Sequence, residues 1–174
     1  MLDNPLRRLL HDPEHLLAGF VTEGATVLDI GCGPGTYTIP MARMVGPAGK
    51  VIALDIQEKM LDKLVHRTVR EGLQSRIRLQ LYSGGRVGVT DRLDFALAFW
   101  MAHEVPAPFS FFSQISPMLK PGASLLLVEP LLHVSRRGFN RTVDAIQSTG
   151  LEPAAAPKIA MSRAVLFERR GLSE

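Results

Sequence analysis

The stretch Val27-Leu-Asp-Ile-Gly-Cys-Gly-Pro-Gly-Thr-Tyr-Thr38 decides the fold of this chain. It joins an apolar run to an amphipathic stretch through glycines at positions 31, 33 and 35. Glycine lets the backbone turn sharply out of a strand and approach a ligand with no Cβ in the way. A dinucleotide-binding loop reads G-x-G-x-x-G, whereas here the third glycine comes one place early. The stretch therefore predicts a strand, a turn and a helix that hold a nucleotide-like cofactor.

Apolar runs alternate with amphipathic stretches from residue 26 onward, which is typical of a parallel sheet wrapped by helices. We expect strands at 26–31, 50–55, 77–81, 94–99 and 123–129, followed by a final pair at 156–161 and 163–169. We expect helices at 5–19, 36–45, 57–71, 107–119 and 136–149. The pattern predicts one α/β domain over 1–174, with 1–20 as a helical lid or edge and 21–174 as the sheet core.

Composition limits the classes of function. The 174 residues are 46% hydrophobic and 21% charged, as in an ordinary globular domain. The net charge is only +3, and the basic pairs are scattered, so nucleic acid is not the expected partner. Cys32 is the single cysteine, which excludes an intrachain disulfide and favours a reducing compartment. With neither a signal-peptide pattern nor a run long enough to cross a bilayer, we expect a cytoplasmic protein.

Two carboxylates stand at the edge where a ligand is expected. Asp55 ends the second predicted strand, and its carboxylate can accept two hydrogen bonds from ribose hydroxyls. Asp29 lies inside the first strand, where it can either brace the glycine loop or contact a ligand ammonium. Both roles for Asp29 stay open.

At this point the chain resembles the class I S-adenosylmethionine-dependent methyltransferases, and is most similar to small stand-alone members of the quinone-biosynthesis branch. Residues 27–35 look like the first motif of that family, 51–55 look like the second, and the resemblance runs through 119–122 to cover roughly 20 to 170. It implies a Rossmann-like three-layer sandwich around a mostly parallel seven-stranded sheet whose last strand is antiparallel. It also implies S-adenosylmethionine as cofactor and S-adenosylhomocysteine as product, with the methionine part over the glycine loop and the ribose on Asp55.

The resemblance predicts which residues contact the cofactor. Ile56 could pack on the adenine face or belong to the core. Many relatives carry an acidic residue after the third strand, but this chain reads Leu81-Tyr-Ser-Gly-Gly85, so Tyr82, Ser83 or backbone atoms would take that place. The expected cofactor-binding residues are Asp29, Gly31, Cys32, Gly33, Pro34, Gly35, Asp55, Ile56, Tyr82, Ser83 and Phe99.

Two histidines and two carboxylates follow the fourth and fifth predicted strands: His103, Glu104, Glu129 and His133. If these strands are neighbours, all four residues are candidates for the acceptor pocket. His103 is the first choice as a base, because a histidine titrates near neutral pH. Glu129 could instead cap backbone N–H groups, and His133 could be an exposed loop residue. The same residue types suit zinc or iron, but they lack tight ligand spacing, and we expect no metal.

These features favour an enzyme that transfers a methyl group by in-line displacement to a small organic acceptor. A binding protein without transfer activity and a dinucleotide-dependent oxidoreductase are the alternatives. The compact chain lacks the inserted segments that usually select substrates in this family. The acceptor would then bind in an open cleft, or a second subunit of a homodimer would complete it.

Overall fold

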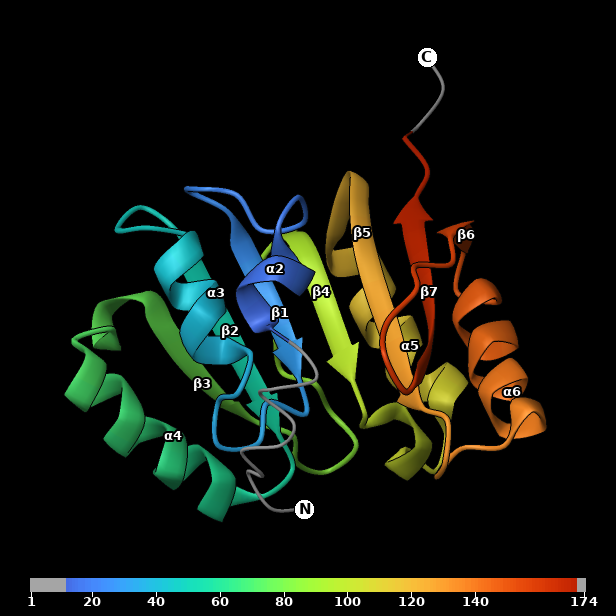
Figure 1. Ribbon diagram of the computed structural model, residues 1–174, viewed down its shortest axis with the longest axis horizontal. Coiled ribbons are helices and arrows are strands. Elements are labelled where there is room, and N and C mark those ends of the chain that lie inside the picture. The colour runs from blue at the N-terminus through green and yellow to red at the C-terminus, as the bar shows by residue number, and fades with distance from the viewer. Residues whose placement is uncertain (1–11, 172–174) are drawn as a thin grey trace.

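A sheet with the strand order β3-β2-β1-β4-β5-β7-β6 forms the centre of the fold in the computed structural model, which describes residues 12–171 (Figure 1). The strands are β1 (Thr26–Ile30), β2 (Lys50–Asp55), β3 (Ile77–Leu81), β4 (Leu93–Phe99), β5 (Leu119–Pro130), β6 (Leu151–Ala155) and β7 (Ser162–Arg169). The α-helices are α2 (Pro13–Leu17), α3 (Thr38–Met44), α4 (Glu58–Glu71), α5 (Pro108–Ile115) and α6 (Arg136–Gln147). Short 3-10 turns are η1 (Gln74–Arg76), η2 (Ala102–Glu104) and η3 (Ser116–Met118).

Strand directions follow from the connections. Strands β3, β2, β1, β4 and β5 pair in parallel, while β7 runs antiparallel to both β5 and β6. A short link joins β6 to β7 without a crossover helix, so these two strands form an antiparallel pair. The expected seven-stranded, mostly parallel sheet with an antiparallel last strand is confirmed.

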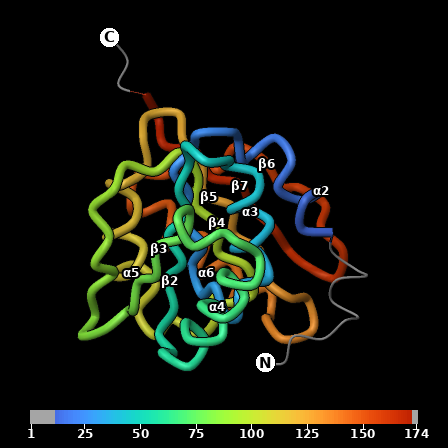
Figure 2. Tube along the Cα trace, turned by 90° about the vertical axis from the view of Figure 1, so that its left-hand side faces the viewer, coloured from blue at the N-terminus to red at the C-terminus, as the bar shows by residue number. Residues whose placement is uncertain are grey.

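Alternate residues of each central strand face opposite layers of helices. Leu28 and Ile52 pack in the cluster that includes α5 and α6 residues, whereas Val27 and Val51 pack with residues of α2, α3 and α4. Figure 2 shows α5 on one side of the strands and α2 and α3 on the other. Strands buried on both faces account for the apolar runs of the sequence. In the described residues, no helix combines the length and the apolar character needed to cross a membrane.

A strap replaces a helix between β3 and β4. Residues 82–92 form turns and an isolated bridge instead of a helix. Val87 and Val89 of this strap are buried against the sheet. Gln114 of α5 clamps the strap, because its Oε1 accepts from Val87 N–H at 3.0 Å and its Nε2 donates to Gly85 O at 2.9 Å. Asp91 fixes the far end through Arg78 of β3 at 2.8 Å.

Three expected boundaries need correction. The strand expected at 156–161 is wrong: β6 lies at Leu151–Ala155, because pairing with β7 determines its position. The helix expected at 107–119 ends at Ile115, since Pro117 follows and β5 begins at Leu119. Of the helix expected at 5–19, residues 5–11 lie outside the described part, and α2 packs on α3 rather than lining the cavity described below. Its role as a lid stays a prediction.

Candidate functional site

A cavity lies over the turn that follows β1, at the carboxyl ends of β1, β2 and β4. This is where open parallel sheets bind ligands. The expected residues that line the cavity are Asp29, Gly31, Cys32, Gly33, Pro34, Asp55, Ile56, Tyr82, Phe99 and Glu104. The expected residues that do not line it are Gly35, Ser83, His103, Glu129 and His133.

The three glycines of the turn have different surroundings, although all have positive φ angles of +68°, +53° and +90° in chain order. A Cβ at Gly31 would lie 2.7 Å from Met101 Cβ, and one at Gly35 would collide with Leu64 of α4. A Cβ at Gly33 would meet no atom within 4 Å. Gly31 and Gly35 are therefore required by packing, whereas Gly33 leaves open space on the cavity side.

Asp55 holds the turn from the neighbouring strand. It is 7% exposed, and its Oδ2 accepts from Gly33 N–H at 2.8 Å while its Oδ1 accepts from Gln57 N–H at 2.8 Å. An ionised carboxylate has about four lone-pair positions, so two remain for a ligand. Asp55 thus combines loop bracing with free acceptor capacity at the cavity wall.

Asp29 is buried and contacts the start of the helix that follows the glycine turn. The side chain is 2% exposed, and its Oδ2 accepts from Thr38 Oγ1 at 2.6 Å at the start of α3. Asp29 also lines the cavity, and its contact to a ligand ammonium stays a prediction.

Ile56 and Tyr82 form an apolar part of the cavity wall. Ile56 is 66% exposed, so the alternative that it belongs to the core is wrong. The Tyr82 ring meets the edge of Phe111 with centroids 5.2 Å apart, and Tyr82 N–H donates to Asp55 O at 2.8 Å. Ser83 is exposed, forms a backbone bridge with Arg86 and does not line the cavity. Tyr82 is therefore the better of the two candidates after β3.

Cys32 lies inside the turn but is not activated. Burial raises the pKa of its thiol far above the ordinary value, and the nearby Asp29 and Asp55 carboxylates raise it further. The thiol therefore stays protonated at physiological pH and cannot act as a thiolate nucleophile.

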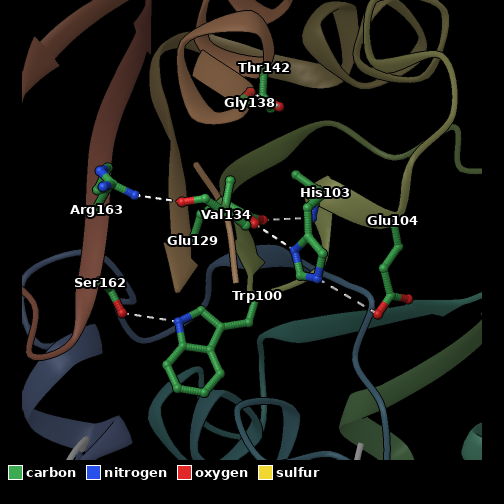
Figure 3. A network of polar contacts seen from close by, with 10 residues as sticks. Trp100, His103, Glu104, Glu129, Val134, Gly138, Thr142, Ser162 and Arg163 are labelled. Atoms are coloured by element: carbon green, nitrogen blue, oxygen red, sulfur yellow. Dashed lines mark hydrogen bonds and ion pairs between the residues drawn. The ribbon is translucent and has the colours of Figure 1, made fainter. Parts of the chain in front are cut away.

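A histidine and a buried glutamate pair where β4 and β5 end. Glu129 on β5 is 1% exposed; its Oε1 accepts from Ala102 N–H at 2.8 Å, and its Oε2 lies 2.6 Å from His103 Nδ1 (Figure 3). An ionised carboxylate can only accept, so with Glu129 ionised and His103 neutral the imidazole proton lies on Nδ1 and Nε2 carries a lone pair. Burial raises the pKa of the Glu129 carboxyl, against the opposing attraction of His103.

The other two acceptor-pocket candidates have different positions. Glu104 lines the cavity, and its Oε1 lies 3.9 Å from His103 Nε2 (Figure 3). His133 is exposed in the turn after β5, because the chain leaves the sheet at Pro130. Within residues 12–171, no three His, Cys, Asp or Glu side chains gather as a metal site would require.

Several cavity residues carried no recognisable signal in the sequence. Met101 reaches the cavity beside Trp100, where the chain turns with a φ of +57°. Phe111, which looks like a core residue, is 5% exposed and still lines the cavity. The remaining unpredicted lining residues are Ile30, Thr36, Tyr37, Leu54, Gln57, Met60, Val105 and Pro106.

A family described as a methyltransferase domain matches residues 27–122. A demethylmenaquinone methyltransferase from Lactobacillus johnsonii is 33% identical over 110 residues, which is 63% of this chain and 45% of that protein. One from Symbiobacterium thermophilum is 32% identical over 120 residues, 67% of this chain and 48% of that protein. The chain thus spans about half the length of the curated relatives it matches.

Solved structures with the same fold cover nearly the whole chain. A SAM-dependent methyltransferase from Aquifex aeolicus has a TM-score of 0.85 at 25% identity and covers 96% of this chain and 94% of its own. A SAM-dependent O-methyltransferase from Thermotoga maritima has a TM-score of 0.73 at 18% identity, and the match covers 94% of this chain and 66% of that protein. This likeness shows the fold only.

Proposed function

Because the chain belongs to the family of methyltransferase domains, we propose that it transfers a methyl group from S-adenosylmethionine to a small organic acceptor. The observation that carries this proposal is the cavity over the glycine turn, bordered by the Asp55 carboxylate and the exposed Ile56 side chain. A dinucleotide-dependent oxidoreductase is a weaker reading, since the turn has the shorter glycine spacing.

The cavity residues fit this cofactor. The N–H groups of Gly33 and Gln57 each occupy one lone pair of the Asp55 carboxylate. Asp55 would use its remaining lone pairs to accept hydrogen bonds from the ribose hydroxyls. Ile56 and Tyr82 would flank the adenine, and Gly33 would allow the methionine part to approach the backbone. Asp29 offers a carboxylate for the ammonium group. When bound, the cofactor supplies a methyl group on a positively charged sulfur, which the acceptor atom attacks in line.

The chain would contribute alignment, exclusion of water and removal of a proton. Forming the new bond to an O–H or C–H position releases one proton from the acceptor. In our proposal His103, which does not itself line the cavity but has Nε2 3.9 Å from the cavity-lining Glu104, takes that proton on Nε2. Glu129 holds Nδ1–H and stabilises the resulting imidazolium. Glu104, at the cavity wall, would orient the acceptor beside His103.

We extend the proposal to an aromatic acceptor of quinone type. The basis is the printed name of the curated relatives, demethylmenaquinone methyltransferase. The apolar wall formed by Phe99, Trp100 and Phe111 suits a flat ring.

Binding is tested first, by titration calorimetry with S-adenosylmethionine, S-adenosylhomocysteine and NAD. We expect the first two to bind and NAD to fail; the reverse would contradict the cofactor assignment. A labelled-methyl assay with reduced quinone-type rings then separates an enzyme from a binding protein. Cofactor binding without transfer to any ring or other small acceptor would favour the binding protein.

The proton-transfer roles need their own variants. His103→Ala should slow transfer while S-adenosylhomocysteine affinity stays near that of wild type. Glu129→Gln should retain part of the rate and change its pH profile, because the neutral amide no longer stabilises an imidazolium. Transfer rates with the same pH profile in wild type and Glu129→Gln would refute this pairing as part of the mechanism.

A further inference from the structure

Three large apolar side chains lie exposed where the turn after β5 meets the link before β7. Leu132 is 84% exposed, Met161 is 47% exposed and Leu131 is 41% exposed. The two segments touch, because Leu131 N–H donates to Met161 O at 2.9 Å. Scattered exposed apolar residues are ordinary, but a group of them at one edge indicates an interaction site. We refer to Leu131, Leu132 and Met161 as the apolar rim.

The apolar rim is fixed beside the cavity. Trp100 lines the cavity, and its Nε1–H donates at 3.0 Å to the Oγ of Ser162, the residue after Met161 (Figure 3). On the other side, Arg163 Nη1 donates at 2.7 Å to Val134 O, which ties β7 to the turn after β5. The rim therefore stands at the same edge of the sheet as the ligand site, and hydrogen bonds hold its backbone.

Basic side chains flank the apolar rim. Arg136 and Arg137 are exposed at the start of α6, and Lys158 is exposed in the link before β7. Segments 130–141 and 156–163 contain no Asp or Glu. Within residues 12–171, none of these three cations forms an ion pair. The surface thus combines protruding apolar side chains with exposed positive charge, and the carboxylate Asp12 lines a second pocket together with Lys158.

We propose that the apolar rim docks on an anionic lipid surface. Leu132 and its neighbours would enter the boundary between headgroups and acyl chains, while Arg136, Arg137 and Lys158 attract the anionic headgroups. A second copy of this chain fits less well, because a symmetric contact at the rim would bring the same cations of both copies together. Docking turns the edge of the cavity toward the bilayer. An acceptor could then enter from the lipid, a consequence that rests on the proposed function.

Flotation of the full chain with lipid vesicles tests the docking without cofactor or acceptor. We expect binding to phosphatidylcholine vesicles that contain phosphatidylglycerol, and little binding to pure phosphatidylcholine. Leu132→Asp should lower the partition coefficient by about tenfold or more, since one apolar side chain is lost from the interface. Replacing Arg136 and Arg137 by Ala should lower it by about fivefold for each arginine.

Val69→Asp is the matched control. Val69 is 56% exposed, but it lies in the last turns of α4. This helix packs on β2 and β3, on the side of the sheet away from β5 and β7. This variant should bind vesicles as wild type does. Leu132→Ser repeats the test with a neutral side chain, and circular dichroism checks that each variant is folded.

Three results would overturn the docking. Two of them are wild-type protein that does not float with anionic vesicles and a Leu132→Asp variant that floats as well as wild type. The other is sedimentation showing that Leu132→Asp splits a stable dimer while vesicle binding is absent, which would make the rim a contact between copies. Failure of methyl transfer leaves the vesicle result unchanged, so the two proposals fail separately.

Discussion

Replacing Asp55 by alanine tests the cofactor site at its central residue. The change removes the carboxylate that we propose binds both ribose hydroxyls. A hydrogen bond to a charged group contributes about 1.5 to 3 kcal/mol, so two together contribute about 3 to 6 kcal/mol. The dissociation constant for S-adenosylhomocysteine should therefore rise by roughly two to four orders of magnitude.

The same substitution also weakens the fold, and this effect has to be separated from the loss of binding. Without Asp55, the N–H groups of Gly33 and Gln57 lose their acceptors, at a cost of about 1 to 3 kcal/mol each if they stay buried. Asp55→Asn keeps one carbonyl oxygen and should lie between alanine and wild type in both stability and affinity. Urea unfolding of each variant measures the stability part.

Asp91→Ala is the matched control for the loss of a carboxylate. Asp91 contacts Arg78 at 2.8 Å and Lys50 at 3.2 Å, but it does not line the cavity. We expect this variant to lose stability and keep its cofactor affinity in titration calorimetry. Asp55→Ala protein that is folded and binds S-adenosylhomocysteine within about threefold of wild type would refute the ribose assignment.

Three further predictions concern the turn and its neighbours. Gly35→Ala should cost about 2 to 5 kcal/mol in urea unfolding, from backbone strain and overpacking, whereas Gly33→Ala should cost about 1 to 2 kcal/mol and mainly weaken cofactor binding; equal losses would contradict this division. The Cys32 thiol should resist iodoacetamide in the folded protein and react after unfolding, as followed by mass spectrometry, and fast labelling of folded protein would exclude a buried, protonated thiol. Because burial raises the pKa of Glu129 above its ordinary 4.5, its contribution to stability is present below that pH and declines as pH rises through the folded-state pKa. The unfolding free energy of Glu129→Gln, relative to that of wild type, should therefore increase from acid to neutral pH. A difference between the two proteins that does not change with pH would contradict the raised pKa.

The cofactor edge was predictable because its determinants are local in the sequence. The turn at Gly31, Gly33 and Gly35 immediately follows β1, and Asp55 ends the next strand, so the two meet whenever β1 and β2 pair in parallel. The neighbouring arrangement of β4 and β5 followed from the family order, whereas the contact between Glu129 and His103 was not predicted.

The features that were not predictable depend on distant contacts. Strand β6 has a weak strand sequence, including Pro153, and takes its position from pairing with β7 at the sheet edge. Gly35 belongs to a cofactor motif, yet its close neighbour is Leu64 of α4, which lies far from it in the sequence. The turn at Trp100 uses a left-handed backbone conformation that its residue type does not favour. His133 resembles His103 in the sequence pattern, but the chain has already left the sheet when it reaches that residue.

The strap at 82–92 makes local opening of the protein depend on its ligand. It covers the sheet with few buried side chains, chiefly Val87 and Val89, beside an edge strand of intermediate burial, so it should open more readily than the central strands. Tyr82, where the strap begins, lines the cavity. We expect the cofactor to contact Tyr82 only while the strap is packed on the sheet. At a concentration about a hundredfold above its dissociation constant, it would stabilise this packed form by about 2.7 kcal/mol. Amide hydrogen exchange in the strap should then slow when S-adenosylhomocysteine is added. The bound ligand would thus stabilise the part of the sheet edge that a strap covers in place of a helix.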